Sequence, residues 1–257
     1  MAACAGQAGK KKCRLDTLLF ERGLAESRAR AQAMIMSGIV YSETKRLDKP
    51  GIQVAPDLPI TLKGQDHPWV SRGGLKLSHG LDFFSINPEG KTCLDVGAST
   101  GGFTDVLLQH GAVSVYAIDV GHGQLDWKLR NDDRVVVLEK TNARHITQAE
   151  VPELVDVIVS DVSFISLMVA LPAALQLTKP SAQLITLIKP QFEVGKEQVG
   201  KGGVVRDAEL HEDVCRKISD WVNGLNGWSV RGITESPITG PKGNKEFLLY
   251  AEKLNAK

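Results

Sequence analysis

The chain has 257 residues, of which 42% are hydrophobic and 24% charged, with a formal net charge of +1. A chain of this length and hydrophobic content can bury one large core, or one core beside a small module. No apolar run reaches the roughly 18 residues that cross a bilayer. Four scattered cysteines without a C-x-x-C spacing indicate neither a zinc site nor a disulfide framework.

The N-terminus does not have the pattern of a secretion signal, because its small residues come before Lys10, Lys11 and Lys12 rather than after them. We therefore expect a cytoplasmic protein that contacts no membrane. We also expect no bound metal, and the sequence gives no sign of an obligate protein partner.

Positive charge gathers at the front of the chain. Residues 1–66 hold 11 Lys and Arg against 7 Asp and Glu, a net +4, and the remainder holds 20 against 23, a net −3. A small basic module before a near-neutral domain is suited to attract a polyanion, although this modest excess alone does not establish nucleic-acid binding. We expect a disordered tip at 1–12, a small module at 13–64, a linker at 65–70 and a large domain at 71–257.

Two short helices are predicted in the small module. Leucines at helical spacing predict the first over 14–22. Ser27 is suited to cap the second, over 27–37, which carries arginines on its outer face. Short strands follow at 39–41 and 52–54.

This arrangement resembles the S4 RNA-binding domain. The matching residues are Arg14-Leu15-Asp16, Leu18-Leu19, Ser27-Arg28, Ala31-Gln32, Gly38-x-Val40 and Lys49-Pro50-Gly51. The family's usual Asn-Gly turn is replaced here by Ser42-Glu43-Thr44. A solvated helix face is the ordinary explanation of exposed arginines, whereas the resemblance implies RNA binding. The residues it implies are Arg14, Arg22, Ser27, Arg28, Arg30, Lys45 and Arg46, with Arg72 beyond the linker.

Residues 92–105 are the most informative part of the chain. An apolar run that meets Gly97 predicts a buried parallel strand, followed by a glycine turn and a helix over 103–110. A second apolar run, 113–118, ends at Asp119, where an acid can bind a ribose diol beyond the carboxyl end of its strand. The spacing is not G-x-G-x-x-G and no Lys follows the loop, so a phosphate-binding loop is not indicated.

The loop resembles the nucleoside and amino-acid cradle of class I S-adenosylmethionine (SAM) methyltransferases. A glycine turn alone could equally be a tight corner without a ligand, but Asp95 before it and Asp119 after it favour the SAM site. The resemblance implies SAM as the cofactor. The cofactor-binding residues we predict are Asp95, Gly97, Ser99, Thr100, Gly101, Gly102, Phe103, Asp119, Asn142 and Asp161.

Strands and helices continue to alternate beyond Asp119, as a doubly wound sheet requires. The further strands are predicted at 135–138, 157–161, 184–189, 229–233 and 246–250, with a long loop over 190–203. A Gly-Pro-Lys-Gly-Asn turn before the last strand indicates an antiparallel hairpin. The expected fold class is α/β: a small α+β S4-like domain, then a Rossmann-like class I SAM-dependent methyltransferase domain with a seven-stranded sheet whose last strand is antiparallel.

Four ionisable residues fall where residues of the crevice belong. Asp161 and Lys189 end the fourth and fifth strands, which places them at one edge of the sheet. Lys76 and Glu246 reach the same edge by resemblance only. The order Lys, Asp, Lys, Glu around a SAM loop is similar to the catalytic tetrad of FtsJ-type RNA ribose 2′-O-methyltransferases. For any one pair of these residues, an ordinary ion pair at the rim of the sheet is the alternative explanation.

From about Arg14 to the C-terminus the chain is similar to the TlyA family, also named haemolysin A. The further motifs that carry this are Ser71-Arg72-Gly73-Gly74-Leu75-Lys76 and Lys189-Pro190-Gln191-Phe192-Glu193. The resemblance implies methylation of a ribose 2′-hydroxyl, that of a cytidine, in ribosomal RNA or ribosomal subunits. It implies Lys189 as the base, with Asp161 and Glu246 holding the amines and the hydroxyl. A free Lys titrates near pH 10.4, so this role needs desolvation or a second cation such as Lys76.

The sequence disfavours two other functions. RNA base methylation is disfavoured, because none of the cysteines follows a proline and the fourth strand leads into Ser160-Asp161-Val162-Ser163-Phe164 rather than Asn/Asp-Pro-Pro-Tyr. An RNA-binding protein with haemolysin-like activity, which the second family name invites, is disfavoured by the lack of a spanning run. The sequence leaves open which nucleotide is modified, in which ribosomal subunit, and the oligomeric state.

Overall fold

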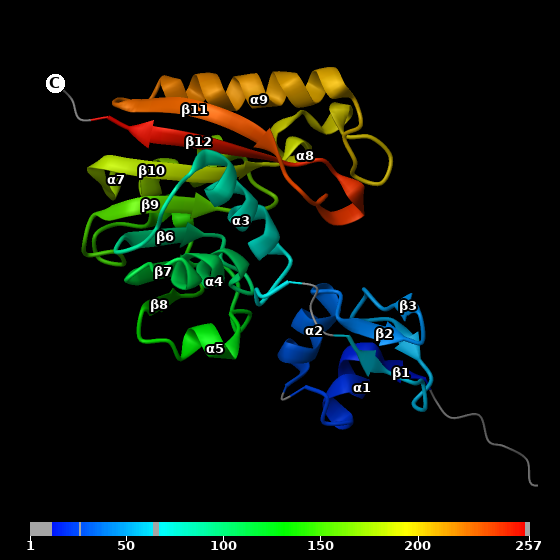
Figure 1. The fold of residues 1–257 in the computed structure, drawn as a ribbon. Helices are drawn as coiled ribbons and strands as arrows, with labels where there is room; N and C mark the ends of the chain where they lie inside the picture. Colours follow the sequence, from blue (N-terminus) through cyan, green and yellow to red (C-terminus); the bar gives the residue numbers. More distant parts are fainter. Residues whose placement is uncertain (1–11, 26, 64–66, 255–257) are drawn as a thin grey trace, which may run out of the picture. The chain divides into compact units, whose positions relative to one another are not determined.

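The computed structural model describes residues 12–25, 27–63 and 67–254. The chain forms two compact units, Met1–Pro68 and Trp69–Lys257 (Figure 1). The disordered tip expected at 1–12 lies outside the described residues except for Lys12, and so does part of the expected linker. Within the described part of the chain, no helix is long and apolar enough to cross a membrane.

The small unit packs two helices over short strands. The helices are α1 (Leu15–Glu21) and α2 (Arg28–Met36), and the strands are β1 (Cys13–Arg14), β2 (Val40–Ser42), β3 (Lys45–Arg46), β4 (Gln53–Val54) and β5 (Thr61–Leu62). β1 pairs with β4, and the other strands form a sheet in the order β3-β2-β5. Both predicted helices are confirmed, with Leu15, Leu19 and Ile35 fully buried between them. Ser27 caps α2, because its Oγ accepts a hydrogen bond from Arg30 N at 3.0 Å.

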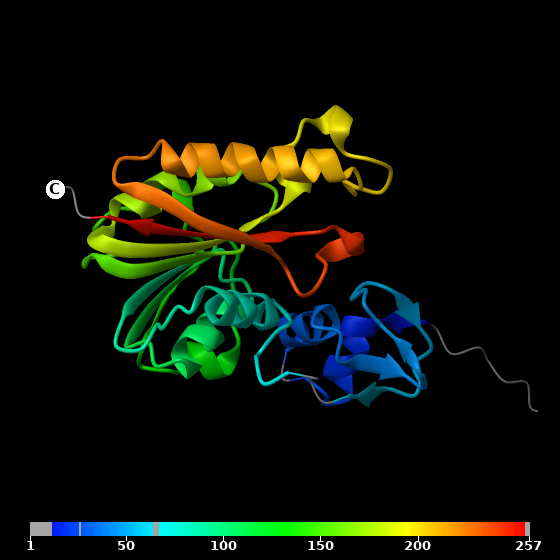
Figure 2. The same cartoon turned by 45° about the horizontal axis from the view of Figure 1, so that its top comes forward.

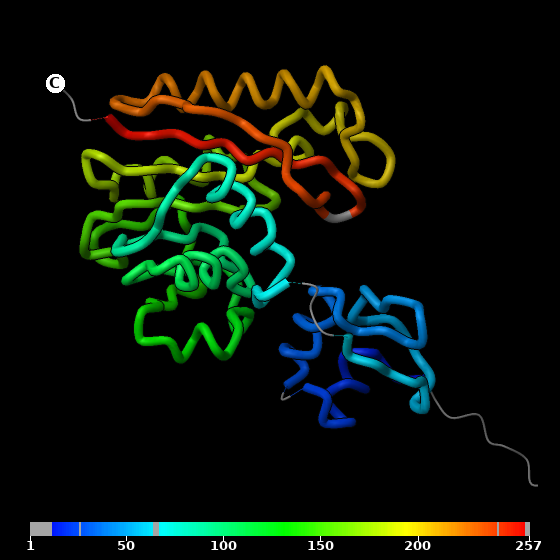
Figure 3. Tube along the Cα trace, in the orientation of Figure 1, coloured from blue at the N-terminus to red at the C-terminus, as the bar shows by residue number. Residues whose placement is uncertain are grey.

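A seven-stranded sheet forms the centre of the large unit. Its strands are β6 (Thr92–Val96), β7 (Ser114–Ile118), β8 (Val135–Leu138), β9 (Val155–Ser160), β10 (Thr178–Ile188), β11 (Trp228–Glu235) and β12 (Phe247–Lys253). Their order is β11-β12-β10-β9-β6-β7-β8, and β12 runs antiparallel to both neighbours. The predicted sheet and its antiparallel hairpin are therefore confirmed. Figure 3 follows the first crossover from β6 to β7.

Helices cover both faces of this sheet. They are α3 (Gly73–Phe84), α4 (Gly102–Gln109), α5 (Trp127–Arg130), α6 (Leu167–Ala170), α7 (Pro172–Gln176), α8 (Pro190–Glu193) and α9 (Ala208–Asn223), with 3-10 turns η1 (Ala143–His145), η2 (Lys196–Gln198) and η3 (Pro241–Gly243). α3, α4 and α5 pack on one face, and α6, α7 and α9 on the other (Figure 2). The loop expected over 190–203 differs from the prediction, because it contains α8 and η2.

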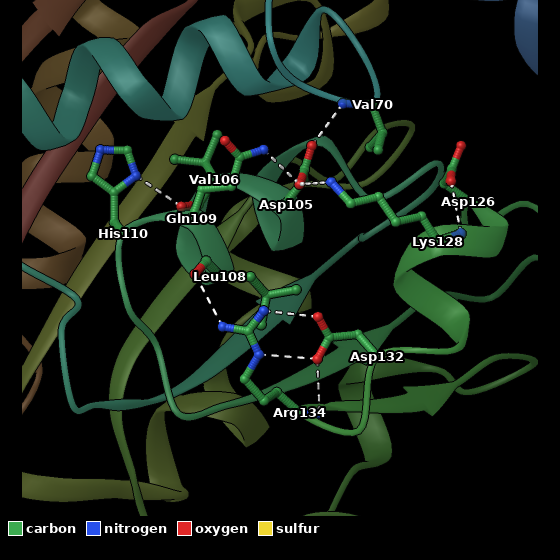
Figure 4. Close-up of polar contacts among 10 residues, drawn as sticks. All are labelled: Val70, Asp105, Val106, Leu108, Gln109, His110, Asp126, Lys128, Asp132 and Arg134. Atoms are coloured by element: carbon green, nitrogen blue, oxygen red, sulfur yellow. Dashed lines mark hydrogen bonds and ion pairs between the residues drawn. The ribbon is translucent and has the colours of Figure 1, made fainter.

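The first residues of the large unit are fixed to α4 (Figure 4). Val70 N donates a hydrogen bond to the buried carboxylate of Asp105 at 2.8 Å, and Gln109 Nε2 donates to the same carboxylate at 2.9 Å. Trp69 is buried and stacks on His110 with ring centroids 5.9 Å apart. These contacts fix where the chain enters α3.

Two glycines of α3 provide a matched test of this packing. A Cβ on Gly74 would lie 2.4 Å from Trp69 Cγ, whereas a Cβ on Gly80 would meet Leu248 Cδ1 at an ordinary 3.5 Å. We expect Gly74→Ala to lower the free energy of unfolding by about 1–3 kcal/mol through overpacking. Gly80→Ala should leave it unchanged or raise it by up to about 1 kcal/mol, because alanine favours the helix. Denaturant titration measures both, and equal effects would contradict this account.

Candidate active site at the carboxyl edge of the sheet

A cavity of about 360 Å³ lies beyond the carboxyl ends of β6, β7 and β9. Its volume is within the range of small-molecule sites, roughly 300–1,000 Å³. Of the residues predicted to bind the cofactor, Gly97, Ser99, Asp119, Asn142 and Asp161 line it. The glycine loop and the two strand-end acids are therefore brought together as the sequence predicts.

The glycine loop is held closely against its surroundings. Gly97 and Gly101 adopt φ of +88° and +92°, which glycine tolerates and other residues rarely adopt. A Cβ on Gly97 would lie 3.2 Å from Val162, and one on Gly101 would lie 2.2 Å from Leu129 Cδ1. The loop can therefore keep this conformation only while these positions carry no side chain.

Asp119 fixes the two backbone segments that frame the cavity. Ser99 N donates to Asp119 Oδ2 at 2.8 Å, and Gly121 N donates to Oδ1 at 2.6 Å. Each carboxylate oxygen can accept a second hydrogen bond, which leaves acceptors for a ligand hydroxyl. Asn142, which also lines the cavity, caps η1, because its Oδ1 accepts a hydrogen bond from Arg144 N at 3.1 Å.

Asp95 takes a different position from the other predicted cofactor residues. It is fully buried in β6, does not line the cavity, and accepts a hydrogen bond from Thr104 Oγ1 of α4 at 2.7 Å. Burial raises the pKa of this carboxyl group to about 7. Four more predicted cofactor residues form the turn and the start of α4 without lining the cavity. They are Thr100, Gly101, Gly102 and Phe103.

The four residues of the predicted tetrad form one chain of ion pairs. Lys189 Nζ lies 2.5 Å from Asp161 Oδ1, and Asp161 Oδ2 lies 3.6 Å from Lys76 Nζ. Lys76 Nζ in turn lies 2.6 Å from Glu246 Oε2. Lys76, Lys189 and Glu246 are buried, and the Asp161 side chain is 21% exposed and reaches the cavity. The structure thus brings together four residues that spacing alone placed only in part.

These ion pairs determine the charge state of the buried lysine Lys76. Burial would lower the pKa of Lys76, but the carboxylates of Asp161 and Glu246 outweigh burial, so that the pKa is raised and Lys76 is a stable cation. As the base, Lys189 was expected to need desolvation or a second cation near it, such as Lys76. Instead, the Asp161 carboxylate lies between the two amines, and each amine has an anionic neighbour.

Sequence reasoning missed two residues that follow Asp161 at the end of β9. Ser163 Oγ accepts a hydrogen bond from Lys189 Nζ at 2.8 Å, which fixes the amine from a second side. Phe164 is 90% exposed at φ +65°, an uncommon conformation for a bulky residue, and its ring lies 5.0 Å from that of Phe192. Both line the cavity. Only their position after a strand-end acid signals such roles in the sequence.

Buried Glu193 joins the segment after β9 to α8. Glu193 Oε2 accepts from Ser166 Oγ at 2.6 Å, and Oε1 accepts from Leu167 N at 2.8 Å. Because Lys189 immediately precedes α8, this carboxylate holds the segment that carries Ser163 and Phe164 beside the amine. The sequence analysis assigned Glu193 no role of its own.

The residues predicted to bind RNA have different environments. Arg14 and Arg28 both contact Asp16, while Arg22 donates to the carbonyls of Leu58, at 2.7 Å, and Pro56. Ser27 Oγ serves the cap of α2, where Arg30 lies in the first turn. The remaining predicted residues are Lys45 and Arg46, which are exposed on β3, and Arg72, which lies before α3 in the large unit.

Comparison with known proteins gives a consistent result over most of the chain. The FtsJ-like methyltransferase family model matches residues 69–253, and the S4 domain model matches residues 13–60. "Putative rRNA methyltransferase YqxC" of Bacillus subtilis is 51% identical over 93% of this chain and 85% of its own. "16S/23S rRNA (cytidine-2'-O)-methyltransferase TlyA" of Mycobacterium tuberculosis is 46% identical over 93% and 90%. The solved "Putative hemolysin from Streptococcus thermophilus" is 44% identical, with a TM-score of 0.74 over 96% of this chain and 90% of that one.

The buried carboxyl group of Asp95 predicts a specific dependence of stability on pH. Its pKa is 3.8 ordinarily and about 7 in the fold. Between these values the folded state keeps a proton that the unfolded chain has lost, so Asp95 makes the free energy of unfolding fall as pH rises through this window. Asp95→Asn cannot ionise. Its melting temperature relative to the original chain should therefore rise from pH 4 to pH 8, and a difference that stays constant with pH would contradict the prediction.

Proposed function

The chain belongs to the FtsJ-like methyltransferase family, in its TlyA branch, and we propose that it methylates a ribose 2′-hydroxyl of ribosomal RNA. The observation that carries this proposal is the chain of ion pairs from Lys189 through Asp161 and Lys76 to Glu246, which opens into the cavity at Asp161. These four groups can donate and accept protons, and Asp161 lies at the cavity that we assign to the methyl donor.

The cavity fits SAM, which supplies a methyl group activated by a sulfonium when it is bound. We assign the ribose diol to Asp119, whose oxygens each have capacity for one more hydrogen bond. The adenine is assigned to the wall formed by Asn142, and the amino-acid part to the loop from Gly97 to Ser99. Asp95 would act indirectly, by holding the start of α4 through Thr104.

A ribose 2′-hydroxyl is a poor nucleophile, so the protein must remove its proton and hold it in line with the methyl group. Lys189 is our candidate for the base, with its Nζ oriented by Ser163 Oγ and Asp161. A lysine must lose its own proton before it can act as a base, and the nearest carboxylate that can accept this proton is Asp161, whose Oδ1 lies 2.5 Å from Lys189 Nζ. Glu246 holds the Lys76 amine through Oε2 at 2.6 Å, while its Oε1 is buried without a hydrogen-bond partner among the described residues.

The nucleotide would be held by Phe164. An exposed aromatic ring offers a face on which an unstacked base can stack, which is how many proteins hold single-stranded RNA. Phe164 lies next to Ser163 and lines the same cavity as Asp161. We propose a cytidine as the target, because the 46% identical relative from M. tuberculosis is named for cytidine 2′-O-methylation.

We assign most of the RNA affinity to the S4 domain and the chemistry to the large unit. Ribosomal RNA or a ribosomal subunit is then the partner, and the reaction takes place in the cytoplasm, where ribosomes are assembled. The relatives named for ribosomal RNA methylation support this choice of substrate.

The role of Lys189 can be tested by substitution. Lys189→Ala should slow methyl transfer by about 10²- to 10⁴-fold, the usual contribution of a general base. Lys189→Arg should not restore the rate, because a guanidinium stays protonated in proteins. The measurement is single-turnover transfer of a labelled methyl group to ribosomal RNA, with SAM affinity determined by calorimetry and expected to stay nearly unchanged.

The matched control is Lys179→Ala. Lys179 also pairs with an aspartate, Asp156, at 2.8 Å, but at the other end of β10. We expect this variant to keep its methyl-transfer rate. A Lys189→Arg enzyme with a near-normal rate would mean that Lys189 only positions or neutralises, and that Asp161, Glu246 or water is the base.

A further inference from the structure

A fully buried carboxylate lies beneath the arginines of the small unit. Asp16 Oδ1 accepts from Arg14 Nε at 3.0 Å, and Oδ2 accepts from Arg14 Nη2 at 2.8 Å, so the pair is bidentate. Arg28 Nη2 lies 3.5 Å from the same Oδ2. Gln32 Nε2 donates to this oxygen at 2.7 Å, and Thr17 N donates to Oδ1 at 2.8 Å. One carboxylate thus joins groups from β1, α1 and α2.

The backbone around Asp16 holds this arrangement in place. Asp16 N donates to Pro50 O at 3.1 Å, and Leu15 N donates to Ile52 O at 3.0 Å. The turn between them carries Gly51, where a Cβ would meet Arg14 Nη1 at an ordinary 3.4 Å. The Arg14 guanidinium therefore lies between Asp16, which it contacts through two hydrogen bonds, and this turn.

The two arginines remain open to solvent although their partner is buried. The Arg14 side chain is 45% exposed and that of Arg28 is 53% exposed, against 0% for Asp16. A guanidinium has five N–H donors, and Asp16 accepts from only two of those of Arg14. Because Arg14 and Arg28 contact the same carboxylate oxygen, both lie close enough for one phosphate group to contact them together.

We propose that Asp16 is a positioning residue for RNA binding, which holds Arg14 and Arg28 as a preformed fork for a backbone phosphate. This inference rests on the proposed function, because it takes RNA as the partner of the small unit. Asp16 never touches the RNA in this account. It acts by removing the cost of ordering two long side chains when the phosphate binds. The hydrogen bonds from Arg14 hold the pKa of Asp16 well below its usual range, so the carboxylate is charged at every working pH.

The proposal makes a prediction whose sign is opposite to that of simple charge attraction. Asp16→Asn removes a negative charge, so electrostatics alone would strengthen binding to a polyanion. Loss of the fork should instead weaken binding of the full chain to deproteinised large-subunit ribosomal RNA by at least about two- to tenfold, because Arg14, which makes the bidentate contact, must be ordered again. Asp48→Asn is the matched control, because Asp48 is an exposed acid in the same unit. It should leave binding unchanged or slightly tighter.

A second arm substitutes Arg14. Arg14→Lys preserves the charge but cannot make the bidentate contact, so it should also weaken RNA binding. Arg14→Ala should cost less in the Asp16→Asn background than in the original chain, because the fork is already lost there. Thermal unfolding and SAM affinity, measured in parallel, identify any variant that fails to fold, and the Arg14 variants decide the question in that case.

The outcomes separate this inference from the proposed function. Asp16→Asn that binds RNA as tightly as Asp48→Asn, or Arg14→Lys that binds like the original chain, would overturn the role of Asp16. Additive effects of Arg14→Ala and Asp16→Asn would overturn it as well. A chain that binds no ribosomal RNA before any substitution would instead contradict the proposed function.

Discussion

The site depends on one constraint: the charges of four buried or partly buried ionisable groups must balance one another through consecutive ion pairs. Taking a charge out of water is costly unless a partner of opposite charge and further hydrogen bonds replace the solvent. Asp161 contacts both lysines, and Glu246 completes the chain at Lys76. Removing Asp161 would leave Lys189 without its anionic partner, and removing Lys76 would leave Glu246 without its cationic partner. These contacts therefore also fix the segments that carry the four residues.

The sheet order is what allows the four residues to meet. β10 lies between β9 and β12, so Asp161 and Lys189 emerge side by side at the carboxyl edge. β12 is antiparallel, and its first residue therefore lies at the same edge: Ile188 pairs with Phe247, which places Lys189 beside Glu246. Lys76 reaches the edge from α3. This helix packs on one face of the sheet, where its Leu77 and Leu248 of β12 belong to the same hydrophobic core. The antiparallel strand is thus a requirement of the site as well as of the fold.

Much of the fold and part of the candidate site could be predicted from local sequence patterns, whereas the other contacts of the site depend on how separate elements pack. The glycine loop, Asp119, Asp161 and Lys189 follow from strand ends, whereas Glu246 was placed at this edge by resemblance only; the pairing of Ile188 with Phe247 shows how it gets there. Asp95 was predicted to bind the cofactor, but in the structure it does not line the cavity and accepts a hydrogen bond from Thr104 of α4 instead. Sequence periodicity does not report the contact between Lys76 and Glu246, the left-handed backbone at Phe164 or the meeting of Arg28 with Asp16, because these depend on how separate elements pack.

The central claim is that this arrangement methylates a ribose 2′-hydroxyl of ribosomal RNA rather than a base. The most direct measurement is to incubate the protein with labelled SAM and unmodified ribosomal subunits, digest the RNA, and identify the labelled nucleoside and its position by mass spectrometry. The account predicts label in a 2′-O-methylated nucleoside, a cytidine, at a defined position. Label on a base, or no protein-dependent label in ribosomal RNA from either subunit, would contradict it.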